Sequence, residues 1–463
     1  MHESVRSPSR QILRGLVISL AAATVAACVT LPHRHARIVP VAAAAIPALV
    51  TVQGRSGAVS EATEARDVAR LQAEGRPELV QMHLGLLAAA GHANLYRGTS
   101  ARLLVDGPAT FGAMKAAIEA AQQRVLAEFY IVEDDGVAAQ IGELLMRKAA
   151  EGVRVSLLYD AVGSISTDSA FFGKLRSAGV NVCSFNPVNP TERLGSWGVV
   201  TRNHRKLLLV DADVAFTGGI NLSNVYSKGS IGSRARRSSS TPAPPATGKE
   251  GPADSGWRDT QVELRGPVVV GMAALFRESW ERQRCEGLLP AAPEPRQANS
   301  GDRVVKLLSS DPTQGEPVNP AYVHLLQAVN ASRESVKLTM AYFAPGADMV
   351  NALSAAARRG VKVDLVLPGQ SDVNLVLHAA RSYYGQMLDA GVRIHEFQNA
   401  VMHAKTAVID GVFSTVGSSN LDWRSIVGNY EIDVIVLGDD FGQAMQALFA
   451  QDVASSRLVD PVQ

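Results

Sequence analysis

Residues 203–221 read NHRKLLLVDADVAFTGGIN, and residues 402–420 read MHAKTAVIDGVFSTVGSSN. The two stretches repeat the same polar residues at the same intervals, while the positions between them are mainly apolar. The recurring residues are His204, Lys206, Asp211, Gly218 and Asn221 in the first stretch, and His403, Lys405, Asp410, Gly417 and Asn420 in the second. Because both copies also carry Gly and Asn at fixed offsets, chance is a poor explanation, and we interpret the motif as functional.

The repetition extends well beyond this motif. AAIEAAQQRVLAEFYIVEDD is echoed by QAVNASRESVKLTMAYFAPG, which in each case predicts an amphipathic helix followed by an apolar strand. LLMRKAAEGVRVSLLYD is echoed by ALSAAARRGVKVDLVLPG, in which Gly152 and Gly360 end a helix before another buried strand. Strands that alternate with helices indicate a largely parallel or mixed sheet covered on both faces. The predicted fold class is α/β, with two pseudo-repeated α/β/α sandwich domains.

Length and composition agree with two domains. The chain has 463 residues, of which 46% are hydrophobic and 19% are charged, which suffices for two ordinary cores. Lys and Arg number 45 against 44 Asp and Glu, so no global field draws the protein to a polyanion, and nucleic-acid binding is not suggested. Cys28, Cys183 and Cys285 have no CxxC spacing, so neither a zinc site nor a disulfide framework is indicated.

The first thirty residues resemble a bacterial export signal. Three arginines precede a short apolar run, GLVISLAAATVAA, which ends at Cys28. Because VAAC resembles a lipobox, we expect residues 1–27 to be a lipoprotein signal peptide and Cys28 to be lipidated, holding the protein at a membrane surface. The alternative is an ordinary signal peptide, or an uncleaved anchor, with an incidental cysteine. Residues 28–76 are predicted to be a tether.

We place the first domain at residues 77–295 and the second at 296–463. The first domain carries an insert at 227–256 that is rich in Ser, Pro, Gly and Ala, and we expect it to be disordered or a mobile loop. An arginine cluster within this insert either contacts anionic lipid headgroups or is merely solvated.

The repeated motif carries a definite chemistry. In an extended strand, residues two apart point to the same side, so the His and Lys of each copy project together. Asp211 and Asp410 then begin tight turns, and return strands carry Asn221 and Asn420 back toward them. Histidine can act as a nucleophile or a general acid near neutral pH, and Lys and Asn suit the oxygens of a bound phosphate. Two facing half-sites would allow in-line displacement at one phosphate in two steps.

The paired motif resembles HxKx4Dx6GSxN of the phospholipase D superfamily. The second copy fits fully, whereas the first has Gly219 where the pattern prefers Ser. The resemblance covers nearly everything from about Ala93 to Ser455. Further stretches resemble bacterial cardiolipin synthases: GSIST, FNP, WRDTQVELRGPVV, LPGQSD, RSYYGQML and GSSNLDWRSIVGNYEIDVIV. The resemblance implies two phospholipase D-like domains that share one active site at their interface, without a metal or another cofactor.

The family mechanism implies a role for each motif residue. His204 is the expected nucleophile, and His403 is expected to protonate the departing alcohol and later to accept the proton of the acceptor hydroxyl. The residues expected to hold the phosphoryl oxygens are Lys206, Lys405, Asn221 and Asn420. Asp211 and Asp410 are expected to be structural.

Two acids are expected to orient the histidines through the far ring nitrogen of each imidazole. They are Asp259 in WRDT and Glu431 in NYEID. The alternative is that each is a strand-end carboxylate paired with Arg258 or Arg424.

The expected function is transfer of a phosphatidyl group from phosphatidylglycerol to make cardiolipin, with phosphatidylglycerol or phosphatidylethanolamine as the second lipid. A hydrolase that releases phosphatidic acid, a secreted nuclease and a non-enzymatic membrane scaffold are alternatives. The balanced charge and the predicted lipid anchor disfavour the nuclease, and the intact histidines and lysines disfavour the scaffold. We expect a monomer in the bacterial cell envelope, with its catalytic domains outside the cytoplasm and the choice between inner and outer membrane left open.

Overall fold

The computed structural model describes residues 50–54, 57–73, 76–89, 93–188, 200–230, 256–287, 289, 300–313 and 318–460. The predicted signal peptide, Cys28 and residues 231–255 of the predicted insert lie outside these ranges. No helix in the described ranges is both long enough and apolar enough to cross a membrane.

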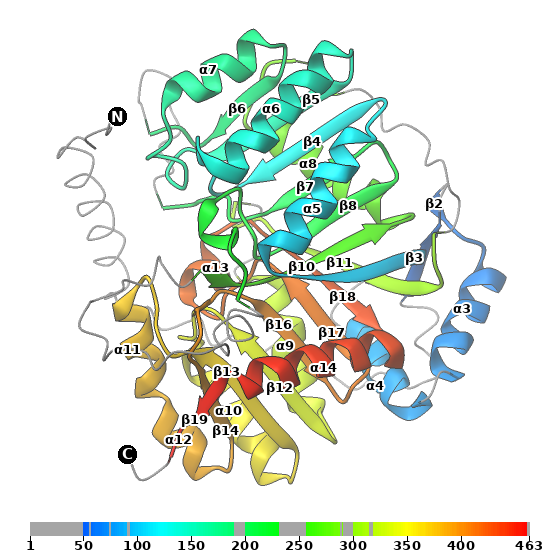
Figure 1. The fold of residues 1–463 in the computed structure, drawn as a ribbon. Coiled ribbons are helices and arrows are strands. Elements are labelled where there is room, and N and C mark those ends of the chain that lie inside the picture. Colours follow the sequence, from blue (N-terminus) through cyan, green and yellow to red (C-terminus); the bar gives the residue numbers. More distant parts are fainter. Residues whose placement is uncertain are drawn as a thin grey trace, which may run out of the picture.

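The first half folds into a mixed sheet with helices on both faces (Figure 1). Its elements are β3 (Ala93–Val105), α5 (Asp106–Glu119), β4 (Arg124–Phe129), α6 (Gly136–Ala150), β5 (Arg154–Asp160), α7 (Ser169–Ser177), β6 (Asn181–Phe185), β7 (Leu207–Val210), β8 (Val214–Gly218), a 3-10 turn η2 (Asn224–Tyr226), β9 (Trp257–Arg258), β10 (Thr260–Arg265) and α8 (Val268–Arg282). The sheet order is β6-β5-β4-β7-β8-β10-β3, parallel from β6 to β4 and antiparallel beyond. Alternate residues of β4 and β7 face helices α5 to α7 on one side and α8 on the other.

The second half repeats this arrangement. Its elements are β11 (Arg303–Ser310), α9 (Pro320–Ala331), β12 (Ser335–Met340), α10 (Gly346–Arg358), β13 (Lys362–Pro368), α11 (Asn374–Ser382), α12 (Tyr384–Asp389), β14 (Arg393–Phe397), β15 (Val401–Met402), β16 (Lys405–Ile409), β17 (Phe413–Gly417), α13 (Trp423–Val427), β18 (Glu431–Leu437), α14 (Asp439–Ala454) and β19 (Ser456–Leu458). The order β14-β13-β12-β16-β17-β18-β11 matches that of the first half strand for strand. Helices α9, α10 and α12 cover one face, and α14 covers the other.

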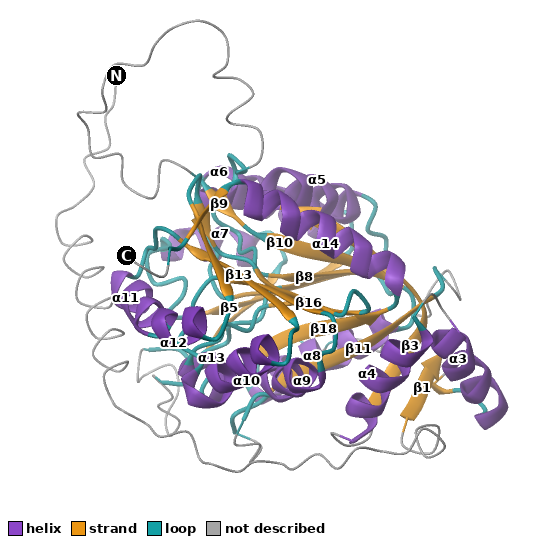
Figure 2. Ribbon diagram, turned by 90° about the horizontal axis from the view of Figure 1, so that it is seen from below, coloured by secondary structure: helices purple, strands orange, loops and turns teal. Residues whose placement is uncertain are grey.

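The two halves are joined into one sheet. Strands β3 and β11, which occupy the same place in each half, pair antiparallel, with Lys306 opposite Leu95. One apolar cluster contains residues from both halves, including Leu209 beneath α8 and Val434 beneath α14. Figure 2 shows the strands running between helices on both sides. The predicted α/β class with two pseudo-repeated α/β/α layers is therefore confirmed.

Glycines end the matching helices as predicted. Gly152 follows α6 with φ +88°, and Gly360 follows α10 with φ +91°. This left-handed conformation is unfavourable for residues with a Cβ atom, so glycine allows the chain to leave the helix and enter the next strand.

The segment predicted as a tether is partly folded. Strand β1 (Val50–Gly54) pairs with β2 (Gly57–Ala58) and runs parallel to β3, and it is followed by α3 (Glu61–Ala73). Helix α4 (Pro77–Ala89), which we assigned to the first domain, instead packs against α9 and buries Leu84 and Leu87 in the core of the second half. Burial of apolar side chains, not position in the chain, decides where α4 packs. Two predictions are therefore corrected: residues 28–76 are not a tether throughout, and α4 does not pack in the first half.

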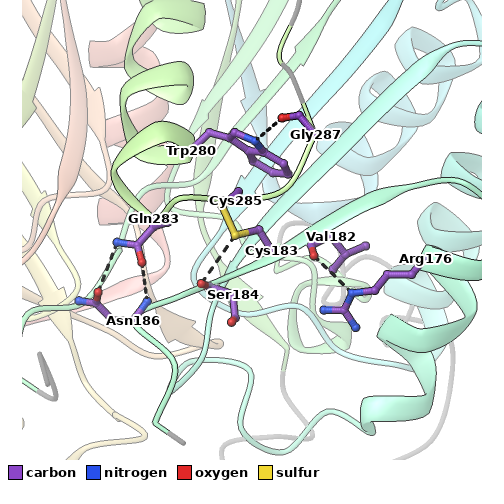
Figure 3. The surroundings of a disulfide bond; sticks show 9 residues. All are labelled: Arg176, Val182, Cys183, Ser184, Asn186, Trp280, Gln283, Cys285 and Gly287. Atoms are coloured by element: carbon purple, nitrogen blue, oxygen red, sulfur yellow. Dashed lines mark hydrogen bonds between the residues drawn. A yellow bond between two sulfur atoms is a disulfide. The ribbon is translucent and has the colours of Figure 1, made fainter. Parts of the chain in front are cut away.

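A disulfide that the sequence did not indicate joins Cys183 of β6 to Cys285, just after α8 (Figure 3). The two cysteines are 102 residues apart in the sequence, so no local spacing indicates that they pair. Next to the disulfide, Gln283 and Asn186 exchange hydrogen bonds of 3.1 and 3.3 Å, which tie the same two segments together. The end of α8 is therefore held against the edge strand β6.

Candidate active site

The two aspartates of the motifs anchor their hairpins to the sheet. Asp211 lies in the turn between β7 and β8 with φ +55°, and its carboxylate accepts hydrogen bonds from the backbone N–H groups of residues 122–124. Asp410, with φ +52°, does the same for residues 333–335 and also contacts His83 Nε2 of α4 at 3.3 Å. Both carboxylates therefore bind the chain where β4 and β12 begin.

The histidines are paired with acids from opposite halves. His204 Nδ1 lies 3.0 Å from Glu431 Oε2 of the second half, and His403 Nδ1 lies 2.7 Å from Asp259 Oδ2 of the first. The backbone crosses in the same way, because His204 N donates to Tyr430 O at 2.9 Å and His403 N donates to Arg258 O at 2.7 Å. The two half-sites thus meet in one buried centre.

Neither acid takes the alternative arginine pairing. The guanidinium of Arg258 instead binds both carboxylate oxygens of Asp452, at 2.7 and 2.9 Å. Glu431 accepts hydrogen bonds from the hydroxyls of Ser418 and Ser425, at 2.5 and 2.7 Å. Both acids are available to orient imidazoles.

The two acids differ in their electrostatic environment. Burial opposes ionisation of Glu431, but His204, Lys206 and the Ser418 hydroxyl together hold its pKa below the ordinary value. Burial raises the pKa of Asp259 to about 6, and Lys405 offsets only part of this effect. The carboxylate beside His204 is therefore the more firmly ionised of the two.

Burial also controls the charges of the basic groups. It lowers the pKa of His204 to about 4 and that of His403 well below the ordinary value, so both imidazoles are neutral near pH 7. It lowers the pKa of Lys206 to about 7 and that of Lys405 to about 8. A bound anion would offset the burial of these cations and raise all four pKa values.

The lysines lie beside the histidines, and the asparagines have defined neighbours of their own. Lys206 Nζ donates to His204 O at 2.5 Å, and Lys405 Nζ donates to His403 O and lies 2.9 Å from His403 Nδ1. Asn221 Oδ1 accepts from Ile131 N at 3.1 Å, which fixes the orientation of its amide group. Asn420 lines a small pocket together with Lys405. The structure thus places each lysine beside the histidine of its own motif and Asn420 beside Lys405.

Aromatic residues that sequence reasoning missed surround the histidines. Tyr130 contacts the His204 ring, with centroids 5.1 Å apart. The rings nearest His403 are those of Trp257, Tyr226 and Tyr342, at 4.8, 5.9 and 6.1 Å. The Tyr226 hydroxyl also lies 3.2 Å from His403 Nδ1. These residues are far apart in the sequence and follow no spacing, so only the fold reveals them.

Comparison with known proteins agrees with this geometry. A family model described as "Cardiolipin synthase, PLD-like domain" matches residues 114–228 and 325–453. The chain is 32% identical to a cardiolipin synthase of Halalkalibacterium halodurans over 73% of its own length and 63% of that relative, so it spans somewhat less than two thirds of that protein. It is 34% identical to cardiolipin synthase A of Pseudomonas aeruginosa over 77% of this chain and 67% of that one.

Among solved structures, the phosphatidylserine synthase of Haemophilus influenzae matches with a TM-score of 0.55 and 13% identity, covering 78% of this chain and 87% of that one. At that identity the match supports the fold alone. The family model and the sequence relatives carry the assignment further: the chain belongs to the cardiolipin synthase family of the phospholipase D superfamily.

Proposed function

We propose that this chain makes cardiolipin by transferring a phosphatidyl group to the glycerol hydroxyl of phosphatidylglycerol. The donor is a second phosphatidylglycerol, which releases glycerol, or phosphatidylethanolamine, which releases ethanolamine. The observation that carries the proposal is the crossed pairing of His204 with Glu431 and of His403 with Asp259. It gives one buried centre two imidazoles whose Nδ1 atoms are held by carboxylates. Each imidazole then presents Nε2 to a phosphate between them.

In the proposed first step, His204 Nε2 attacks phosphorus and the bond from phosphorus to the headgroup oxygen breaks. His403 supplies the proton that the departing alcohol needs. In the second step, His403 removes the proton of the acceptor hydroxyl, the acceptor oxygen attacks phosphorus, and the phosphorus–nitrogen bond to His204 breaks. Lys206, Lys405, Asn221 and Asn420 hold the phosphoryl oxygens throughout.

The electrostatics support this assignment of roles. His204 is neutral near pH 7, as a nucleophile must be, and the ionised Glu431 stabilises the positive charge that its ring gains during the attack. His403 must be protonated to act first as an acid, and the negative charge of the bound phosphodiester raises its pKa toward that state.

Attachment to a membrane outside the cytoplasm is the second part of the proposal, with lipidated Cys28 as the anchor. The disulfide between Cys183 and Cys285 supports it, because such bonds persist in oxidising compartments. Ile165 and Leu375, which are 40% and 44% exposed, follow the matching strands β5 and β13 and offer apolar contacts to a lipid surface. Labelled palmitate that failed to enter the wild-type protein would contradict the anchor.

The test of the activity is lipid analysis by mass spectrometry after incubation of the purified protein with phosphatidylglycerol, alone and then with phosphatidylethanolamine. We expect cardiolipin and free glycerol from phosphatidylglycerol alone, at a rate that a chelator does not change. His204→Ala serves as the inactive control. Phosphatidic acid as the sole product would identify a hydrolase, and cleavage of DNA without any lipid turnover would refute the lipid assignment.

A further inference from the structure

A tyrosine and an aspartate form a fixed pair beside His403. Tyr342 follows β12, and its hydroxyl donates to both carboxylate oxygens of Asp372, at 2.8 and 3.0 Å. Asp372 also accepts from the Ser371 hydroxyl at 3.3 Å, and it is exposed. The edge of the Tyr342 ring contacts His403, with centroids 6.1 Å apart and planes at 85°. Both of these donors are uncharged groups.

Trp257 forms a second wall of the same region. Its ring lies 4.8 Å from the His403 ring, at an angle of 46°. Trp257 and Tyr342 are both partly exposed, whereas His403 is 5% exposed. The two aromatic rings therefore lie between the buried imidazole and the surface.

These three residues have no counterparts at the matching positions of the duplicated fold. Val132 and Phe343 form equivalent bridges, to Leu222 and Leu421. The residues just before them are Ile131 and Tyr342, so Ile131 is the first half's equivalent of Tyr342. Counting from Gly152 and Gly360 places Ser164 opposite Asp372, and counting from Asp259 and Glu431 places Asn429 opposite Trp257. The duplication explains the histidines, lysines and asparagines, but it does not explain this cluster.

The charge of Asp372 limits what the cluster can bind. The phosphodiester is anionic and is held by the two lysines, and a carboxylate in its immediate surroundings would repel it. Burial lowers the pKa of Lys405, and Asp372 lies near enough to offset a part of this effect, after Asp259 and Glu431. A group that donates hydrogen bonds or carries positive charge is the suitable neighbour for this carboxylate, and the face of Trp257 suits a cation or an aliphatic chain.

We propose that Tyr342, Asp372 and Trp257 form a headgroup subsite that takes a hydrogen-bond-donating alcohol or amine, such as the glycerol or ethanolamine moiety of the lipid. The inference rests on the proposed function, in which His403 protonates the departing headgroup and later activates the acceptor, so that both pass through the region beside this histidine. Asp372 selects the headgroup through its carboxylate, and Tyr342 holds that carboxylate in place.

The test compares release of the headgroup from phosphatidylglycerol, phosphatidylethanolamine and phosphatidylmethanol, each dispersed in detergent, as kcat/KM for the full chain. Methanol offers the subsite neither charge nor a hydrogen-bond donor. Asp372→Ala should lower kcat/KM by roughly tenfold or more for phosphatidylglycerol and phosphatidylethanolamine, with little change for phosphatidylmethanol. Asp372→Asn should retain more of its kcat/KM for phosphatidylglycerol than for phosphatidylethanolamine, because an amide oxygen still accepts a hydrogen bond but carries no charge.

Tyr342→Phe provides an independent variant, which keeps the ring against His403 but frees Asp372. It should show the same headgroup-selective loss to a smaller degree. Asp389→Asn, an exposed change at the end of α12, is the matched control and should behave as wild type. An equal loss for all three lipids, or no loss for any, would overturn the subsite. A wild-type protein that releases no headgroup at all would overturn the proposed function itself, and the subsite with it.

Discussion

At the residue scale, the two histidines differ in their surroundings rather than in their motifs. His204 is paired with Glu431, whose charge is stabilised by serine hydroxyls, and Tyr130 contacts its ring. His403 is paired with Asp259, whose pKa is raised to about 6, and it lies among three aromatic rings. A firmly ionised partner favours the histidine that must become cationic during nucleophilic attack, which is the role proposed for His204.

This difference leads to a prediction about the covalent intermediate. His204→Ala should prevent labelling of the enzyme by a phosphate-labelled donor, because the nucleophile is missing. His403→Ala should lose a factor of about 10² to 10⁴ in turnover of natural lipids, the usual contribution of general acid catalysis. With a p-nitrophenyl ester, whose leaving group needs little protonation, the first step should survive in His403→Ala.

The intermediate should then accumulate in His403→Ala, because no base remains to activate the acceptor. Acid-labile, base-stable label mapped to His204 by peptide analysis is the expected result. Label on His403 in the His204→Ala protein would reverse the two roles, and label in neither variant would contradict a phosphohistidine mechanism.

At the element scale, each motif is a hairpin that an aspartate fastens to the start of the neighbouring strand, β4 in the first half and β12 in the second. Asp211 and Asp410 both adopt positive φ, and each binds three consecutive backbone N–H groups. The tight turn after the strand could be predicted from sequence, because Asp and Gly at that position favour it. The partner N–H groups could not be predicted, because they lie 87 to 89 residues away for Asp211.

The same distinction applies to the whole site. The motif residues and the helix-strand repeats follow fixed local spacings, so they and the fold class could be predicted. The exchange of Asp259 and Glu431 between halves could not, because spacing does not say which acid meets which histidine. Helix α4 precedes the first half in the chain but buries Leu84 and Leu87 in the core of the second half, a placement that chain order does not reveal.

Removing the turn anchors tests their role. Asp211→Ala and Asp410→Ala should each lower the free energy of unfolding by roughly 1–3 kcal/mol, because three backbone N–H donors, most of them partly buried, lose their acceptor. Urea unfolding followed by circular dichroism measures the change, with Asp389→Ala as an exposed control. Burial opposes ionisation of Asp410, but His83 and the backbone N–H groups lower its pKa, so its contribution is present above the unfolded pKa of Asp, near 4, and is lost as the pH falls further.

The Asp410→Ala protein should therefore lose less stability than wild type when the pH is lowered below about 4. Unchanged unfolding at neutral pH in both variants would show that the aspartates contribute little to the hairpins.

At the scale of the whole molecule, the two halves are interlocked at several places. Strands β3 and β11 pair across the centre, β9 pairs with β15 beside the active site, and α4 of the N-terminal segment packs on the second half. The site is assembled only when both halves are folded and joined, since each histidine needs an acid from the other. Any restraint on the first half therefore also affects the geometry around His204.

The disulfide is such a restraint, because it holds the edge strand β6 against the end of α8. The segment that follows β6 leads to Arg202, whose guanidinium donates to Phe185 O and Asn186 O at 2.9 and 2.8 Å and to Asp160 Oδ2 at 3.0 Å. Asp160 Oδ2 also accepts from the backbone N–H of Asn203, next to His204, at 2.9 Å. A continuous series of contacts thus connects the disulfide region with the backbone next to His204.

Replacing both cysteines by serine should lower the free energy of unfolding by about 2–4 kcal/mol, because the unfolded chain gains freedom across a 102-residue loop. Thermal unfolding of the wild-type protein should shift downward in the presence of a reductant, whereas the double variant should not respond. At low temperature the double variant should keep most of its activity on soluble esters, since Gln283 and Asn186 still join the two segments. If the unfolding temperature of the wild-type protein does not change with the reductant, and both cysteines react with a thiol reagent, the disulfide does not form in solution.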